Sequence, residues 1–224
     1  MWQAPQAMWQ AASRWFQLGP PVDEARWVVL DVESSGLDVR SDRLLAIAAM
    51  GVHFDGGRPR LQVADSFEVV LRQPEATAPA DKANILLHGI GVGAQREGVD
   101  AAEALAAFAR WVAASPLIAF HAAFDRAMLD RACRAAGLPV LPASAWLDLA
   151  PLAAVLHPGV RAKALDDWLA HFGIVCAIRH QAASDTLATA ELLLRLWPAL
   201  RRALPKPGLR AAQALADAQR WMPG

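Results

Sequence analysis

The chain has 224 residues, of which 55% are hydrophobic and 20% charged, and its 22 lysines and arginines balance 22 acidic residues. So many apolar residues can fill the core of one substantial domain, which excludes a mainly disordered chain. Zero formal net charge excludes a basic protein that coats long nucleic acid by releasing its counterions. Any contact with nucleic acid must therefore be local.

Cys133 and Cys176 stand alone, without the Cys-x-x-Cys spacing of a zinc site or a disulfide framework. We expect both to be reduced core residues of a cytoplasmic protein. No apolar run approaches the ~20 residues of a membrane span. The N-terminus also lacks the basic start and compact apolar stretch of a signal peptide, so we expect no membrane association.

The first 22 residues place Trp2, Trp9 and Phe16 on one helical face, which predicts an added amphipathic helix. Its aromatic face packs either on the main domain or on a partner, which includes a second copy of the chain. The sequence leaves both alternatives open.

Three strand-like runs come next: RWVVLDV, RLLAIAAMGVHF and RLQVADSFEVVL. An Asp-Gly-Gly hairpin signal separates the last two, so we expect an antiparallel meander. Residues 74–97 are rich in proline and glycine and predict a long functional loop. Beyond it, helices and strands alternate. They are an amphipathic helix capped near Asp100, the buried strand PLIAFHA, a helix ending at Gly137 and the short strand SAWLDL.

The remaining chain reads as helical, over residues 149–156, 163–172, 182–204 and 209–222. This order predicts an α/β fold with a mixed five-stranded sheet, in which a three-strand antiparallel meander is joined by parallel strands and flanked by helices. We expect three parts: an N-terminal helical extension (1–22), the main domain (23–204) and a C-terminal helix (205–224).

Two acids end the first predicted strand. Asp31 and Glu33 are two residues apart and so project from the same side of the strand. Burial and a like-charged neighbour both favour a protonated carboxyl unless a cation lies between the two groups. The stretch VVLDVESSGLD therefore predicts a metal site, although a turn-forming acid and a solvated edge residue remain an alternative.

Two further acids are placed to reach the same edge of the sheet. Asp125 follows a buried strand at the start of a helix, and Asp185 lies in the first turn of a long apolar helix. Open α/β sheets place their sites at the carboxyl ends of strands. Taken singly, Asp125 could be an ordinary helix residue and Asp185 a capping acid. His180, five residues before Asp185, is suited to take a proton from water.

These stretches resemble the DEDDh family of 3′-to-5′ exonucleases, the family of the proofreading epsilon subunit of bacterial DNA polymerase III. VVLDVESSGLD is similar to the first family motif, AFHAAFDRAML to the second and RHQAASDTLAT to the third. SDRLLAIAAMGV and LLHGIG resemble the second strand and a His-Gly-Ile loop. The sister branch has a tyrosine in place of the third-motif histidine, and this chain contains no tyrosine.

The resemblance implies a ribonuclease H-like fold and a nuclease site with the ligands Asp31, Glu33, Asp125 and Asp185. These carboxylates would hold two divalent cations, Mg²⁺ or Mn²⁺, with His180 as the general base. The implied reaction releases nucleoside 5′-monophosphates from single-stranded DNA 3′ ends. The implied role is stand-alone DNA repair or nucleotide clearing.

We expect substrate contacts from six residues near these motifs, although Leu37 and Phe124 could instead be plain core: Ser34, Gly36, Leu37, His88, His121 and Phe124. His121 replaces a usual Asn and Ala46 a usual Glu, which puts substrate handling in question. An exoribonuclease with the same chemistry, and a nucleic-acid-binding or assembly module of the same fold, are the alternatives.

Overall fold

The computed structural model describes residues 22–74 and 82–218. Its single sheet has the order β3-β2-β1-β4-β5 and is built from β1 (Arg26–Ser34), β2 (Leu44–Asp55), β3 (Arg58–Val70), β4 (Leu117–Ala119) and β5 (Trp146–Asp148). β1 to β3 form an antiparallel meander, whereas β4 runs parallel to both β1 and β5. The predicted mixed five-stranded sheet is thus confirmed. The aromatic helix predicted near the N-terminus lies outside the described residues.

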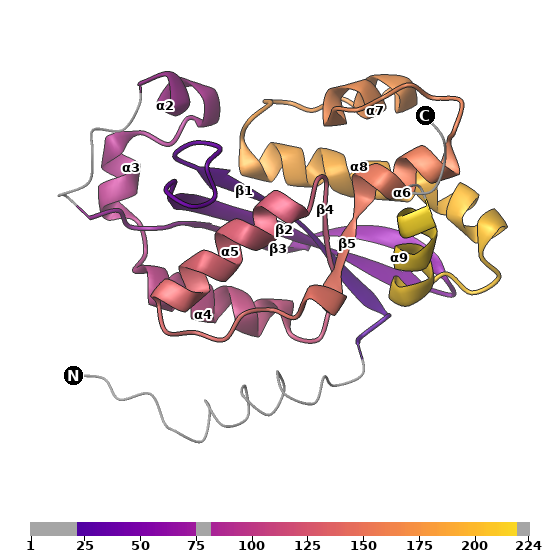
Figure 1. Ribbon diagram of the computed structural model, residues 1–224, viewed down its shortest axis with the longest axis horizontal. Coiled ribbons are helices and arrows are strands. Elements are labelled where there is room, and N and C mark those ends of the chain that lie inside the picture. The colour runs from indigo at the N-terminus through magenta and orange to yellow at the C-terminus, as the bar shows by residue number, and fades with distance from the viewer. Residues whose placement is uncertain (1–21, 75–81, 219–224) are drawn as a thin grey trace.

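Helices cover both faces of the sheet (Figure 1). One face is packed by α4 (Ala101–Val112) and α5 (Ala123–Ala135); the other carries α6 (Leu149–Leu156), α7 (Leu165–Phe172), α8 (Ala182–Ala203) and α9 (Leu209–Asp217). α9 lies against α6 and β5 and shares their core. None of the helices in residues 22–74 and 82–218 has the length and apolar character needed to span a bilayer.

The alternation along β1 assigns its side chains to two cores. Trp27 and Val29 pack with α8, while Val28 and Leu30 pack with α4 and α5, and all four are at most 1% exposed. Because side chains alternate along a strand, Asp31 continues the face of Trp27 and Val29, as does Glu33 two residues on. The two acids therefore point toward the side of the sheet that α8 covers.

Local signals in the sequence account for the turns. Gly56 and Gly57 form the β2–β3 hairpin with φ of 54° and 73°, values that favour glycine. The Asp100 side chain accepts hydrogen bonds from the backbone N–H of Ala102 (3.0 Å) and Glu103 (3.3 Å) and so caps α4. Both features match the sequence-based expectation.

The long loop expected over residues 74–97 is partly wrong, because this segment contains α2 (Lys82–His88) and α3 (Val92–Glu97). Helices this short make fewer than two turns, so an amphipathic repeat hardly shows and the glycines and prolines dominate the pattern. α2 is tied to the sheet by Asn84, whose amide donates to the Ser34 carbonyl (2.9 Å). This bond sets α2 beside the carboxyl end of β1.

The packing of α8 predicts the cost of losing one of its leucines. Leu193 is fully buried against the sheet, so Leu193→Ala should lower the free energy of unfolding by about 2 to 5 kcal/mol. The matched control is Leu187→Ala on the same helix, whose side chain is 37% exposed and should cost less than half as much. Urea unfolding of both variants measures the difference, and equal losses would contradict the described packing.

Candidate active site

The four predicted acids come from three different elements. Asp31 and Glu33 lie near the carboxyl end of strand β1. Asp125 lies in the first turn of α5, and Asp185 in the first turn of α8. β1 is central in the sheet, so its carboxyl end is flanked by both helices. Asp125 is fixed there because its Oδ1 accepts a hydrogen bond from the Val32 backbone N–H (3.2 Å).

The electrostatics of Asp31 show that the four acids converge. Burial raises the pKa of Asp31 well above its usual range, and the neighbouring charges of Asp125, Glu33 and Asp185 raise it further. Of the residues that the structure describes, the Arg179 guanidinium acts on this pKa in the opposite direction. The Asp31 carboxyl therefore lies within electrostatic reach of all three other acids.

Two other carboxyls are perturbed in the same direction. Burial, followed by the charges of Asp185 and Asp125, raises the pKa of Glu33 to about 8. Burial raises the pKa of Asp125 to about 7, partly offset by the hydrogen bond from Val32. At neutral pH too little positive charge therefore lies near the cluster to compensate its carboxylates.

Arg179 is a residue that the sequence analysis missed. Its guanidinium forms ion pairs with Asp185 and with Asp166 on α7. Asp185 also accepts hydrogen bonds from the Cys176 thiol (3.3 Å) and the His180 backbone N–H (2.9 Å). Cys176 is half-buried and reaches the site rather than being a plain core residue as expected. The only available signal for Arg179 was its place directly before His180.

His180 and His121 share an unusual backbone conformation. Both have a positive φ, 60° for His180 and 62° for His121, which is uncommon for residues with a side chain. The His180 side chain is exposed beside Asp185, on the segment that leads into α8. His121 is held by Asp148, whose Oδ1 accepts its backbone N–H (3.0 Å), and by a contact between its Nε2 and the Lys163 carbonyl (3.2 Å).

Three of the expected substrate contacts lie at the end of β1 and in the loop after it, and only one of these three is exposed. Ser34 is buried and its hydroxyl donates to the Gly36 carbonyl (2.6 Å). A Cβ at Gly36 would lie 2.4 Å from Asp42 Oδ2, so any side chain here would displace the Asp42 carboxylate from its bonds within the loop. Leu37, in contrast, is 88% exposed. Of these three residues, Leu37 alone is free to meet a substrate without rearrangement.

The other two expected substrate contacts are less accessible. His88 is buried at the end of α2, where its Nδ1 accepts the Ile90 backbone N–H (2.9 Å). Burial lowers the pKa of His88, which favours a neutral ring. Phe124 is half-buried against the α4–α5 core. The geometry gives both residues a packing role at the rim of the site.

Asp148, at the end of β5, is a further acid that the sequence analysis did not single out. It caps α6 by accepting the Ala150 backbone N–H (3.0 Å), and its charge raises the pKa of Asp125. Its position at the carboxyl end of a strand, as for Asp31, was the signal that could have identified it.

The donor set suits hard divalent cations, since all four converging side chains are carboxylates. Glu33 Oε1 is buried without a hydrogen-bond partner, which leaves a lone pair available to a cation. As the side chains stand, no group of three or more His, Cys, Asp or Glu residues in the described chain is arranged to hold a metal ion. Asp185 is instead engaged by Arg179, which would have to release it and keep Asp166 when a cation binds.

Comparison with known proteins assigns the family. Residues 28–193 match the family model described as exonuclease. The chain belongs to the exonuclease family. The resemblance to DEDDh-type exonucleases, and the enzyme class that goes with it, are thereby confirmed at the level of the family. Members of this family generally use divalent metal ions.

Two curated proteins are similar to this chain over most of its length. A DNA polymerase III subunit epsilon-like protein of Rhodobacter capsulatus is 32% identical over 188 residues, which cover 81% of this chain and 25% of that protein. The PolC-type DNA polymerase III of Bacillus subtilis is 28% identical over 175 residues, covering 78% of this chain and 12% of the polymerase. The chain therefore spans a quarter or less of the length of these two relatives.

Solved structures of nucleases share the fold. E. coli exonuclease I in complex with a dT13 oligonucleotide superposes with a TM-score of 0.65 at 15% identity, over 80% of this chain and 42% of that one. Cell-death related nuclease 4 gives 0.65 at 13% identity, over 77% and 63%. At this identity the likeness bears on the fold, and it confirms the ribonuclease H-like architecture.

The raised carboxyl pKa values predict how stability depends on pH without metal. The folded protein retains protons on Glu33 and Asp125 that the unfolded chain releases, so in EDTA the melting temperature should fall as the pH rises from about 5 to 8. Added Mn²⁺ should raise it, and more at pH 8 than at pH 5, because the cation replaces protons. Thermal melts over this pH range measure both effects.

A matched pair of variants isolates the site. Glu33→Gln should flatten the pH dependence, whereas Asp55→Asn, which changes an acid 78% exposed in the β2–β3 hairpin, should leave it unchanged. A melting temperature that rises with pH in EDTA, or an equal Mn²⁺ response in both variants, would contradict the account of the cluster.

Proposed function

We propose that this chain is a metal-dependent 3′-to-5′ exonuclease that releases nucleoside 5′-monophosphates from the ends of single-stranded DNA. The observation that carries the proposal is the convergence of Glu33, Asp125 and Asp185 on the half-buried Asp31 carboxyl, with Asp125 held at the end of β1 by the Val32 backbone N–H. A structural role does not account for it, because four like-charged groups gathered at one strand end destabilise the fold. A site that binds cations accounts for the convergence of these acids.

The four carboxylates would hold two divalent cations, Mg²⁺ or Mn²⁺. Such ions, when bound, supply charge stabilisation at phosphorus and lower the pKa of water. Asp31 and Glu33 would hold them from β1, while Asp125 and Asp185 close the site from the two helices.

His180 is the proposed general base. In the reaction, the oxygen of a water molecule attacks the terminal phosphorus while the bond from phosphorus to the 3′ oxygen of the preceding nucleotide breaks. The His180 imidazole takes the proton from the attacking water, and the leaving 3′ oxygen takes a proton from solvent water to become the new 3′ hydroxyl. The exposed ring and positive φ of His180 support this role, because the ring can approach a bound strand end without moving α8.

The DNA preference rests on the relatives named above, two of which are DNA polymerase proteins, and on exonuclease I with its bound dT13. An exoribonuclease would use the same residues. Leu37, exposed next to the first two acids, is the proposed apolar contact for a terminal base. The proposed cytoplasmic location and pairing through the N-terminal helix stay predictions.

The test follows mononucleotide release from a labelled single-stranded DNA and from its RNA counterpart, with Mg²⁺, with Mn²⁺ and with EDTA. We expect metal-dependent shortening from the 3′ end, faster on DNA. His180→Ala should reduce the rate by about 10²- to 10⁴-fold, the usual contribution of a general base. His171→Ala removes an exposed histidine from α7 and serves as the matched control, with the rate unchanged.

Either of two results would overturn the proposal. One is shortening that persists in EDTA, which would remove the metal from the reaction. The other is the absence of shortening on both substrates with either metal, which would favour a nucleic-acid-binding module of the same fold. Faster shortening of RNA would keep the mechanism and reverse the substrate.

A further inference from the structure

The outer face of α5 and the loop after β1 form a groove with an unusual concentration of arginines. Its volume is about 580 Å³, and the residues that line it are Val39, Arg40, Ala123, Arg126, Ala127, Asp130, Arg131 and Arg134. Four arginines thus face one acid, in a chain whose formal net charge is zero. None of these lining residues is aromatic, which argues against a surface on which bases stack.

One end of the groove lies at the same turn of α5 as Asp125. Ala123 and Arg126 flank Asp125 in the first turn of α5, and the groove follows the helix as far as Arg134. Eight residues of helix span about 12 Å at 1.5 Å per residue. In Figure 1, α5 runs from the middle of the sheet toward the edge of the molecule, so the groove leads outward from the site. Arg131 Nη1 donates to the Arg40 carbonyl (2.7 Å), which joins the two walls.

The ion pairs inside the groove are weak enough to be exchanged. Asp130 lies 3.9 Å from Arg126 Nε and 3.5 Å from Arg134 Nη2, and the two arginine side chains are 44% and 65% exposed. Ion pairs this long, with arginine side chains this exposed, contribute little to stability, although the Asp130 side chain itself is 15% exposed. Both guanidinium groups can therefore turn to an incoming phosphate, with which arginine forms stronger, bidentate hydrogen bonds.

The acids of the neighbouring loop, Asp38 and Asp42, do not line the groove, although the charge of Asp38 acts on Arg131. Asp42 Oδ2 accepts the Asp38 backbone N–H (2.8 Å), and its Oδ1 accepts the Ser35 hydroxyl (2.9 Å). Asp38 in turn accepts the Arg40 backbone N–H (2.9 Å) and the Ser41 hydroxyl (2.8 Å). Their carboxylates are thus committed to the loop's own backbone and hydroxyl groups.

We propose that this groove binds the sugar-phosphate backbone of the substrate strand, on the 5′ side of the nucleotide being removed. The inference rests on the proposed exonuclease function and deepens it, because it makes a polynucleotide rather than a free nucleotide the preferred substrate. Contacts to phosphates carry no sequence information, so the groove orients the strand without selecting bases. The 3′ end is thereby presented to Asp125 and its neighbouring acids.

The experiment measures how salt weakens binding of a single-stranded DNA oligonucleotide, by fluorescence anisotropy in EDTA so that the strand stays intact. Arg126, Arg131 and Arg134 are changed together to glutamine. Each phosphate contact on a single strand contributes about 0.7 to the slope of log K against log salt, so losing three contacts should reduce the slope by about two. The corresponding triple lysine variant should keep most of the slope.

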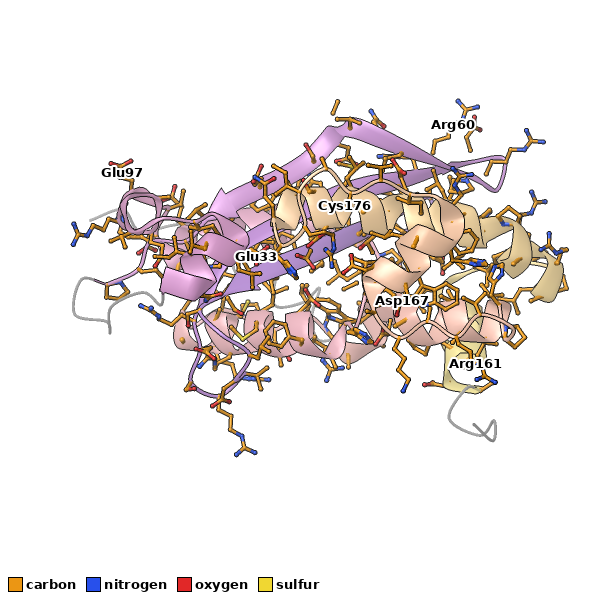
Figure 2. The ribbon with its side chains drawn as sticks, turned by 90° about the horizontal axis from the view of Figure 1, so that it is seen from above. Glu33, Arg60, Glu97, Arg161, Asp167 and Cys176 are labelled. Atoms are coloured by element: carbon orange, nitrogen blue, oxygen red, sulfur yellow. The ribbon has the colours of Figure 1, made fainter. Side chains whose placement is uncertain are left out.

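The matched control changes three arginines elsewhere, Arg58, Arg60 and Arg202, to glutamine. Figure 2 shows Arg60 at the tip of the β2–β3 hairpin, far from Glu33 at the site, and it is 73% exposed. The control removes the same total charge and should leave the slope within about half a unit of the native value. Equal slopes for the groove variant and the native protein, or equal reductions in both glutamine variants, would overturn the proposal.

Failure of the groove can be told apart from failure of the proposed function. The p-nitrophenyl ester of thymidine 5′-monophosphate has no strand beyond one nucleotide, so its metal-dependent hydrolysis should be the same in the native protein and the groove variant. A groove variant that loses ester hydrolysis as well has a damaged site, which overturns the assignment of these arginines to the strand. A native protein that binds DNA with the full slope but, with metal, leaves both the ester and the DNA strand intact keeps the groove and removes the nuclease.

Discussion

Mutual repulsion among Asp31, Glu33, Asp125 and Asp185 is the constraint on which the rest of the site depends. The four carboxylates are held together because each belongs to an element whose position is set by a core, not by the acids themselves. β1 is packed on both faces, and α5 and α8 press on it from opposite sides. The free energy of those cores offsets the electrostatic cost of gathering the acids.

Arg179 partly neutralises the negative charge of the four acids when no metal is bound. Its ion pairs with Asp185 and Asp166 place one positive group beside the cluster and link α7 to the segment that begins α8. The same segment carries His180, so the arginine and the proposed base lie next to each other in the chain. An exchange of Arg179 from Asp185 to Asp166 alone would open the fourth ligand and leave the histidine in place.

Most of the sheet and four of the acids could be predicted because their signals are local. Alternating and continuous apolar runs gave the strands, the Asp-Gly-Gly turn gave the hairpin, and strand ends followed by acids pointed to Asp31 and Asp125. α2 and α3 were missed because six or seven residues make fewer than two helical turns, too few for an apolar repeat to stand out beside the glycines and prolines. The arginine groove joins α5 to the loop after β1, and no local pattern encodes such a contact between distant segments, whereas Asp148 had the same strand-end signal as Asp31 and was overlooked.

Direct titration of Mn²⁺ into the metal-free protein, followed by the electron paramagnetic resonance signal of the free ion, tests the central claim most directly. The account predicts saturable binding near neutral pH, weakened by about 10-fold or more in Asp31→Asn, since each converging carboxylate is a ligand. Arg179→Ala should bind Mn²⁺ at least as tightly as the native protein, because Asp185 is then free. Binding that is absent in the native protein, or unchanged in Asp31→Asn, would contradict a cation site at the end of β1.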